Sequence, residues 1–147
     1  MSTILRIHGL NLNVDEVLES TSLKPDTVWR KGDLQFLTKP NGKKKESSGL
    51  TVLVSNADFD DFKTQIVEST RFLEENWTEI RNIVEHHGVD CVTLDFGIEL
   101  RDVPFHSDIL PPSLIALAAK AGIWLELSHY PIADDQAKSE QDAPPNA

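Results

Sequence analysis

The sequence predicts an α/β fold of the α+β type, in which helices pack on one face of a mainly antiparallel sheet. Two observations indicate this fold class. One segment alternates apolar residues with polar residues or glycine, which is typical of a strand with one packed face. An amphipathic helical segment and a second alternating segment follow it along the chain. The apolar residues of the first alternating segment are Val92, Leu94, Phe96, Ile98 and Leu100.

Proline and glycine mark the boundaries of that helix and of the last strand. Pro111 and Pro112 are expected to begin the helix, because a proline in the first turn loses no hydrogen bond. Gly122 is expected to end it in a left-handed conformation. The helix has an apolar stripe, and the last strand alternates up to Pro131. These segments contain Leu114, Leu117, Ala118 and Ala121 in the stripe, then Ile123, Leu125 and Leu127 between Trp124, Glu126 and Ser128.

The first half of the chain predicts shorter elements. A strand is expected at residues 4–8 and a helix after Asn13, with Glu16 in the position of a capping box. Residues 27–33 are predicted to be extended and to end in a turn, and residues 34–38 to return as a second strand. Residues 39–49 are rich in turn-forming residues and predict an exposed loop. The β-branched and aliphatic residues at 50–54 then predict a buried strand.

Residues 55–87 predict a long helix. Acidic residues lie near its start and two histidines near its end, where each charge suits the helix dipole. Roughly 28 residues is long for a helix in a globular protein, so a break is expected between Ser69 and Asn76. The order of strands and helices predicts a two-layer, ferredoxin-like sandwich. The apolar residues at helical spacing are Phe59, Phe62, Ile66, Leu73, Trp77, Ile80 and Val84.

Length and composition limit the class of protein. The 147 residues predict one domain at residues 1–131 and a disordered acidic tail at residues 132–147. No apolar run approaches the roughly 18 residues of a membrane span, and no secretory signal pattern is present, so a cytoplasmic protein is expected. Cys91 is the only cysteine, which excludes an intrachain disulfide. The net charge of −10 makes nucleic acid an unfavourable partner.

Known catalytic motifs are absent from the sequence. It contains no glycine-rich phosphate loop, no Gly-x-Ser-x-Gly and no His-Glu-x-x-His, so a non-catalytic protein without a cofactor is expected. An enzyme stays the third hypothesis. It would require His8 and His129, on the first and last strands, to be neighbours and to meet Asp95 or Glu126. Nothing in the spacing of these residues demands a metal.

Charge is segregated along the chain. Residues 24–45 hold seven basic and two acidic residues, a net charge of +5, whereas residues 58–87 hold eight acidic and three basic residues, a net charge of −5. The leading hypothesis is therefore a protein-binding module that offers an acidic helix face to a basic partner. The residues predicted to bind that partner are Glu68, Glu75 and Glu79.

The string Trp29-Arg30-Lys31-Gly32-Asp33 is the most motif-like in the chain. Its structural interpretation is a tryptophan that covers the edge of the sheet, followed by a Gly-Asp turn. Its functional interpretation is an anion or partner site with Trp29 as anchor and Arg30 as donor. The second interpretation gives the alternative function, a regulatory domain that binds a small anionic ligand through Trp29, Arg30, Lys31 and Asp33.

The same string forms part of a resemblance to a known family. Pro25, the string itself, the strand after the long helix, the segment 114–118 and Gly122 together resemble a bacterial family, domain of unknown function four-two-seven-nine. The final residues that carry the resemblance are Leu125, Leu127 and Tyr130, and it covers about residues 5–131. It implies a small cytoplasmic protein encoded near secreted toxins and carries no assigned activity. It therefore suggests an immunity protein that neutralises a basic toxin domain.

Overall fold

The computed structural model describes residues 2–132. The expected disordered tail thus lies, apart from Ile132, outside the described residues. The elements are β1 (Thr3–Gly9), α1 (Val14–Ser20), β2 (Thr27–Trp29), β3 (Ser48–Ser55), α2 (Phe62–Glu75), α3 (Trp77–Val84), β4 (Cys91–Glu99), α4 (Pro112–Ala121) and β5 (Trp124–Tyr130).

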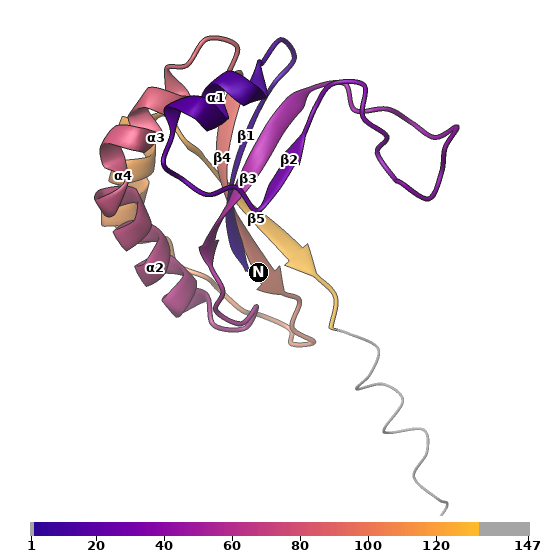
Figure 1. The fold of residues 1–147 in the computed structure, drawn as a ribbon. Coiled ribbons are helices and arrows are strands. Elements are labelled where there is room, and N and C mark those ends of the chain that lie inside the picture. The colour runs from indigo at the N-terminus through magenta and orange to yellow at the C-terminus, as the bar shows by residue number, and fades with distance from the viewer. Residues whose placement is uncertain (1, 133–147) are drawn as a thin grey trace, which may run out of the picture.

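The strands form one sheet in the order β2-β3-β1-β4-β5. All neighbouring pairs are antiparallel except β4 and β5, which are parallel. Figure 1 shows the helices gathered on one side of this sheet. The predicted mixed fold, with a mainly antiparallel sheet and helices on one face, is therefore confirmed. None of the described helices is long and apolar enough to cross a membrane.

The core lies between the helices and the central strands. Leu5 on β1 stands opposite Val52 on β3 and Leu94 on β4, and all three side chains are buried. The buried residues of β4 on this face are four of the five predicted ones, Val92, Leu94, Phe96 and Ile98. The fifth, Leu100, lies beyond the end of β4 and is 44% exposed. Burial of such a layer supplies most of the free energy that favours folding, at roughly 25 cal/mol per Å² of apolar surface.

One buried polar residue also connects the layers. Gln65 on α2 is fully buried, and its side-chain oxygen accepts a hydrogen bond of 2.9 Å from the hydroxyl of Thr3 on β1. Its side-chain nitrogen donates to the carbonyl oxygen of Gly97 on β4 at 2.9 Å and to that of Asp58 at 3.1 Å. A single glutamine thus joins α2, its preceding loop and two central strands.

Several predicted boundaries are confirmed. The long helical region breaks at Asn76, which ends α2 and precedes α3. Gly122 ends α4 with φ of +79°, the left-handed conformation that glycine adopts at least cost. Asn13 does precede α1, but its side chain donates to Glu16 and makes no bond to the helix backbone. The long helical region begins at Phe62 and not at residue 55, because Asp61 caps it by accepting from the backbone N–H of Thr64.

The prediction of a strand at residues 34–38 is wrong. Only an isolated bridge between Leu34 and Lys44 forms there, and β2 pairs with β3 instead. Phe36 and Leu37 are 58% and 92% exposed, so this segment has no apolar surface against which a strand could pack. Figure 1 shows the connection between β2 and β3 projecting from the rest of the fold.

Candidate interaction surface

The face of the sheet opposite the helices is open, and its residues follow from the strand registers. Trp124 pairs with Thr93 and Glu126 with Asp95, and these four side chains share the open face. Trp124 is 68% exposed and Tyr130 50% exposed. Because a strand alternates its side chains between two faces, the period-two pattern predicts which residues lie on this surface once the covered face is known.

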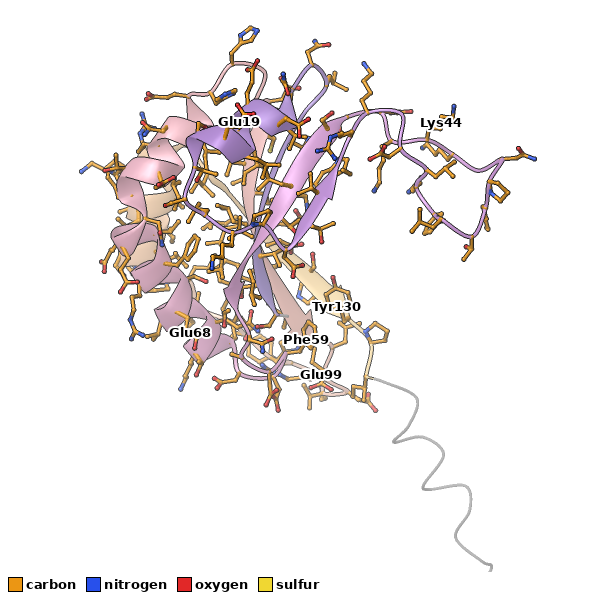
Figure 2. All side chains as sticks on the ribbon, in the orientation of Figure 1. Glu19, Lys44, Phe59, Glu68, Glu99 and Tyr130 are labelled. Carbon is orange, nitrogen blue, oxygen red and sulfur yellow. The ribbon has the colours of Figure 1, made fainter. Side chains whose placement is uncertain are left out.

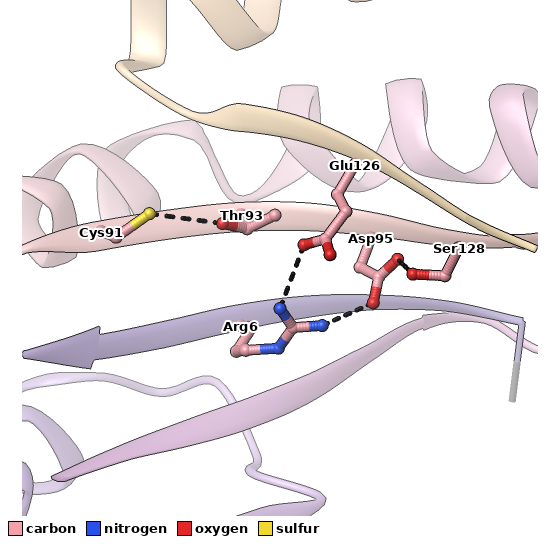
Figure 3. Close-up of polar contacts among 6 residues, drawn as sticks. All are labelled: Arg6, Cys91, Thr93, Asp95, Glu126 and Ser128. Carbon is pink, nitrogen blue, oxygen red and sulfur yellow. Dashed lines mark hydrogen bonds and ion pairs between the residues drawn. The ribbon is translucent and has the colours of Figure 1, made fainter. Parts of the chain in front are cut away.

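An ion-paired network crosses the open face. Arg6 on β1 donates to Asp95 on β4 at 2.5 Å and to Glu126 on β5 at 3.1 Å, as Figure 3 shows. Ser128 donates to the other oxygen of Asp95 at 2.6 Å. Asp95 and Glu126 therefore converge, because their strands pair. Arg6 compensates part of their charge, and it could not be identified from the sequence because its partners lie 89 and 120 residues away.

The histidines of the catalytic hypothesis do not converge. β4 lies between β1 and β5, so the first and last strands are not neighbours, as the catalytic hypothesis required them to be. His8 stands opposite Cys91, whereas His129 stands beside Ile98. Positions 91 and 98 of one strand face opposite sides of the sheet, which separates the two histidines. Among residues 2–132, no group of three His, Cys, Asp or Glu side chains could hold a metal ion.

The Trp29–Asp33 string forms a turn held by internal contacts. The backbone N–H of Arg30 donates to the carboxylate of Asp33 at 2.7 Å, and the Arg30 guanidinium pairs with Asp15 at 2.5 Å. The hydrogen bond from Arg30 lowers the pKa of Asp15. Lys45 places its ammonium group 5.5 Å from the centre of the Trp29 ring. These contacts favour the structural interpretation of the string.

The three predicted partner-binding glutamates differ in their contacts. Glu79 accepts hydrogen bonds from the hydroxyls of Thr21 and Ser22, both at 2.6 Å, and from the backbone N–H of Ser22 at 3.2 Å. These bonds lower the pKa of Glu79. Glu68 accepts from the hydroxyl of Ser55. Glu75 is exposed, and its carboxylate has no hydrogen bond or ion pair within the described part of the chain.

The predicted basic and acidic surfaces do not face each other. Figure 2 places Lys44 on the projecting connection between β2 and β3, and Glu68 on the opposite side of the molecule. A partner that met both surfaces would have to reach around the domain.

A pocket of about 560 Å³ lies between the start of α2 and the connection that precedes α4. Phe62 and Ile66 form its buried part, and Lys63, Asp108 and the exposed Ile109 are among its other residues. Arg101 and Asp108 on its wall form an ion pair of 3.5 Å. Sequence periodicity could not locate this pocket, because half of its lining lies on an irregular segment.

Comparison with known proteins adds no relative: no family model, curated protein or solved structure matches this chain.

Proposed function

We propose that this chain is a non-catalytic protein-binding module, and that a basic protein partner binds to the open face of its sheet. The observation that carries this proposal is the presence of exposed aromatic side chains on a face that no described helix covers. Trp124 and Tyr130 are largely exposed there, and Trp29 is half-buried at the other edge. Tryptophan, tyrosine and arginine are enriched among the residues that dominate the binding energy of protein interfaces.

Charge favours a basic partner. Within the described residues, but outside 24–45, the chain holds 18 acidic and 6 basic residues, a net charge of −12. On the open face itself, Asp95, Glu99 and Glu126 outnumber Arg6. Opposite charge on the two partners speeds their encounter and penalises partners of the wrong sign.

The sheet face is better suited to binding than the predicted acidic helix face. The carboxylates of Glu79 and Glu68 already bond to Ser22, Thr21 and Ser55, so a partner would have to displace those contacts. Glu75 alone offers an uncommitted carboxylate there. The proposal includes the partner and role expected from the resemblance, a basic toxin domain and an immunity protein that neutralises it.

The same proposal covers the finer fold class. The antiparallel order β2-β3-β1-β4, with helices between β1 and β2 and between β3 and β4, supports a ferredoxin-like unit. α4 and β5 would then be an addition that widens the open face by one strand.

The test uses single substitutions on opposite sides of the domain. The full chain is used to capture its partner from native lysate, the partner is identified by mass spectrometry, and the purified pair is titrated by calorimetry. We expect a basic protein whose dissociation constant rises about 30-fold with Trp124→Ser, as for a hot-spot residue. The matched control is Ile115→Ser on α4, which removes an apolar side chain 46% exposed on the helical side.

Two outcomes would overturn the proposed surface. Unchanged affinity of Trp124→Ser would remove the sheet face from the interface. Loss of binding by Glu75→Lys, with Trp124→Ser unaffected, would assign the interface to the acidic helix face instead.

A second candidate function, binding of a small ligand, is favoured by the 560 Å³ pocket. Its volume lies within the roughly 300–1,000 Å³ of known small-molecule sites, and it combines apolar and charged groups. A thermal-shift screen of metabolites with the wild type and with Ile66→Trp, which fills the pocket, tests this function. Stabilisation of both proteins by the same compound would place its site elsewhere.

A further inference from the structure

A second, smaller pocket lies at one end of the open face. It has a volume of about 430 Å³ and is lined by Phe59, Tyr130 and Glu99, together with Asp58, Asp60 and Pro131. The Phe59 and Tyr130 rings lie 5.3 Å apart between their centres and are tilted by 54°. Figure 2 shows Phe59, Glu99 and Tyr130 together at this end of the molecule. Two tilted aromatic rings thus form the walls of a pocket that also contains a carboxylate.

The backbone holds these three side chains in place. The N–H of Glu99 donates to the carbonyl oxygen of Phe59 at 3.0 Å, and the N–H of Leu100 donates to that of Tyr130 at 2.7 Å. A side chain at Gly97 would place its Cβ 2.4 Å from the Phe59 ring, so only glycine lets this ring lie against β4. These backbone hydrogen bonds tie the loop before α2 and the end of β5 to the end of β4, so the pocket is present without a ligand, which lowers the entropic cost of binding.

The chemistry of the walls selects a cation. Phe59 and Tyr130 are 38% and 50% exposed, so part of each side chain is accessible, and aromatic rings attract cations. Glu99 is half-buried, and its carboxylate has no hydrogen bond or ion pair with any of residues 2–132. A guanidinium group can stack on an aromatic ring while it donates to a carboxylate, which suits this combination of groups.

We propose that the Phe59–Tyr130–Glu99 pocket binds an arginine side chain of the protein partner. This inference rests on the proposed function, because it names the group by which a basic partner would be anchored at one end of the open face. The arginine would pack against the exposed sides of the two touching rings and donate to Glu99, and Asp58 and Asp60 at the rim would favour its approach.

The test replaces the partner with a small arginine derivative. Tyr130 serves as the probe, because it is the only tyrosine of the chain. Selective ¹³C labelling of tyrosine gives ring signals from this residue alone, and these are followed by NMR as N-acetyl-arginine amide is added to the full chain. We expect saturable shifts with a dissociation constant on the order of 1–10 mM, typical of a single small group on a partly exposed site. N-acetyl-citrulline amide, which has the same shape without the charge, should leave the signals in place.

Variants distinguish binding in this pocket from general attraction of arginine amide to an acidic protein. Glu99→Gln and Gly97→Ala should each weaken arginine amide binding at least fivefold, the first by removing the carboxylate and the second by displacing the Phe59 ring. Glu75→Gln removes the same charge from the exposed surface of α2 and should leave the affinity unchanged. Glu99→Gln retains the size of the side chain, so the test stands even if Gly97→Ala fails to fold.

Two results would overturn the inference. They are equal shifts with the arginine and citrulline amides, or full affinity in Glu99→Gln. Neither affects the comparison of Trp124→Ser with Ile115→Ser, so the inference and the proposed function can fail separately.

Discussion

Replacement of Gln65 by methionine should destabilise the fold by far more than the loss of one surface contact. Methionine has a similar length but cannot replace the three hydrogen bonds of the glutamine, which join α2 to β1, β4 and the loop before α2. The Thr3 hydroxyl and the Gly97 carbonyl, both on buried residues, would each lose a partner.

The magnitude follows from the cost of buried polar groups left without a partner. Each such group costs about 1–3 kcal/mol, so two groups give a loss of about 2–6 kcal/mol in the free energy of unfolding. For a chain of this size, that loss corresponds to a fall in Tm of roughly 4–24 °C. Urea denaturation followed by the fluorescence of the three tryptophans measures the loss directly.

A double-mutant cycle makes the reasoning refutable. Thr3→Val removes the hydroxyl that Gln65→Met leaves unpaired, so the double variant should be more stable than the sum of the two single losses by about 1–2 kcal/mol. Gln35→Met, on the exposed connection between β2 and β3, is the matched control and should change stability little. A loss below about 1 kcal/mol for Gln65→Met, or strict additivity in the cycle, would refute the role given to these bonds.

Three further predictions concern the fold. Asp95→Asn should cost about 1–3 kcal/mol in urea denaturation, because it weakens the charged hydrogen bond that Arg6 donates to Asp95. Ser128→Ala should cost less, and equal losses would contradict the importance of the ion pair. The lowered pKa of Glu79 means that its stabilising bonds are present above the ordinary glutamate pKa of about 4.3 and are lost as the pH falls through its own lower pKa. Glu79→Gln should therefore reduce the fall in Tm between neutral and acidic pH. An equal fall in Tm in the variant and the wild type would show that Glu79 does not contribute to it. Gly122→Ala should cost about 1–2 kcal/mol because alanine must adopt the left-handed conformation, and a neutral result by calorimetry would mean that the end of α4 relaxes freely.

Sequence patterns predicted the parts of the fold that local chemistry determines. The alternation on β4, the prolines and glycine around α4 and the break before Trp77 all depend on residues close together in the chain. The strand predicted at residues 34–38 failed because alternation says nothing about whether a packing surface exists for those side chains. Whether a segment is a helix or a strand is therefore easier to predict than which other segments it pairs or packs with.

The candidate sites depend on which elements pair or pack together, and they were therefore harder to predict. Asp95 meets Glu126 only because β4 pairs with β5, and Arg6, which bonds to both, was not among the predicted residues. Phe59 was assigned to the long helix, whereas it precedes α2 and its ring lies on Gly97. Only the three-dimensional arrangement shows that a loop residue and the last residue of β5 share one pocket.

The central position of β1 has a consequence for how the protein is made. β1 is synthesised before both of its neighbours. It is paired on both sides only after β3, with Val52, and then β4, with Leu94, have been synthesised. Contacts between residues so distant in sequence slow folding, and an unpaired apolar strand is prone to aggregate in the meantime. We therefore expect nascent chains that stop before β4 to depend on chaperones, and those that include β4 to become resistant to proteolysis.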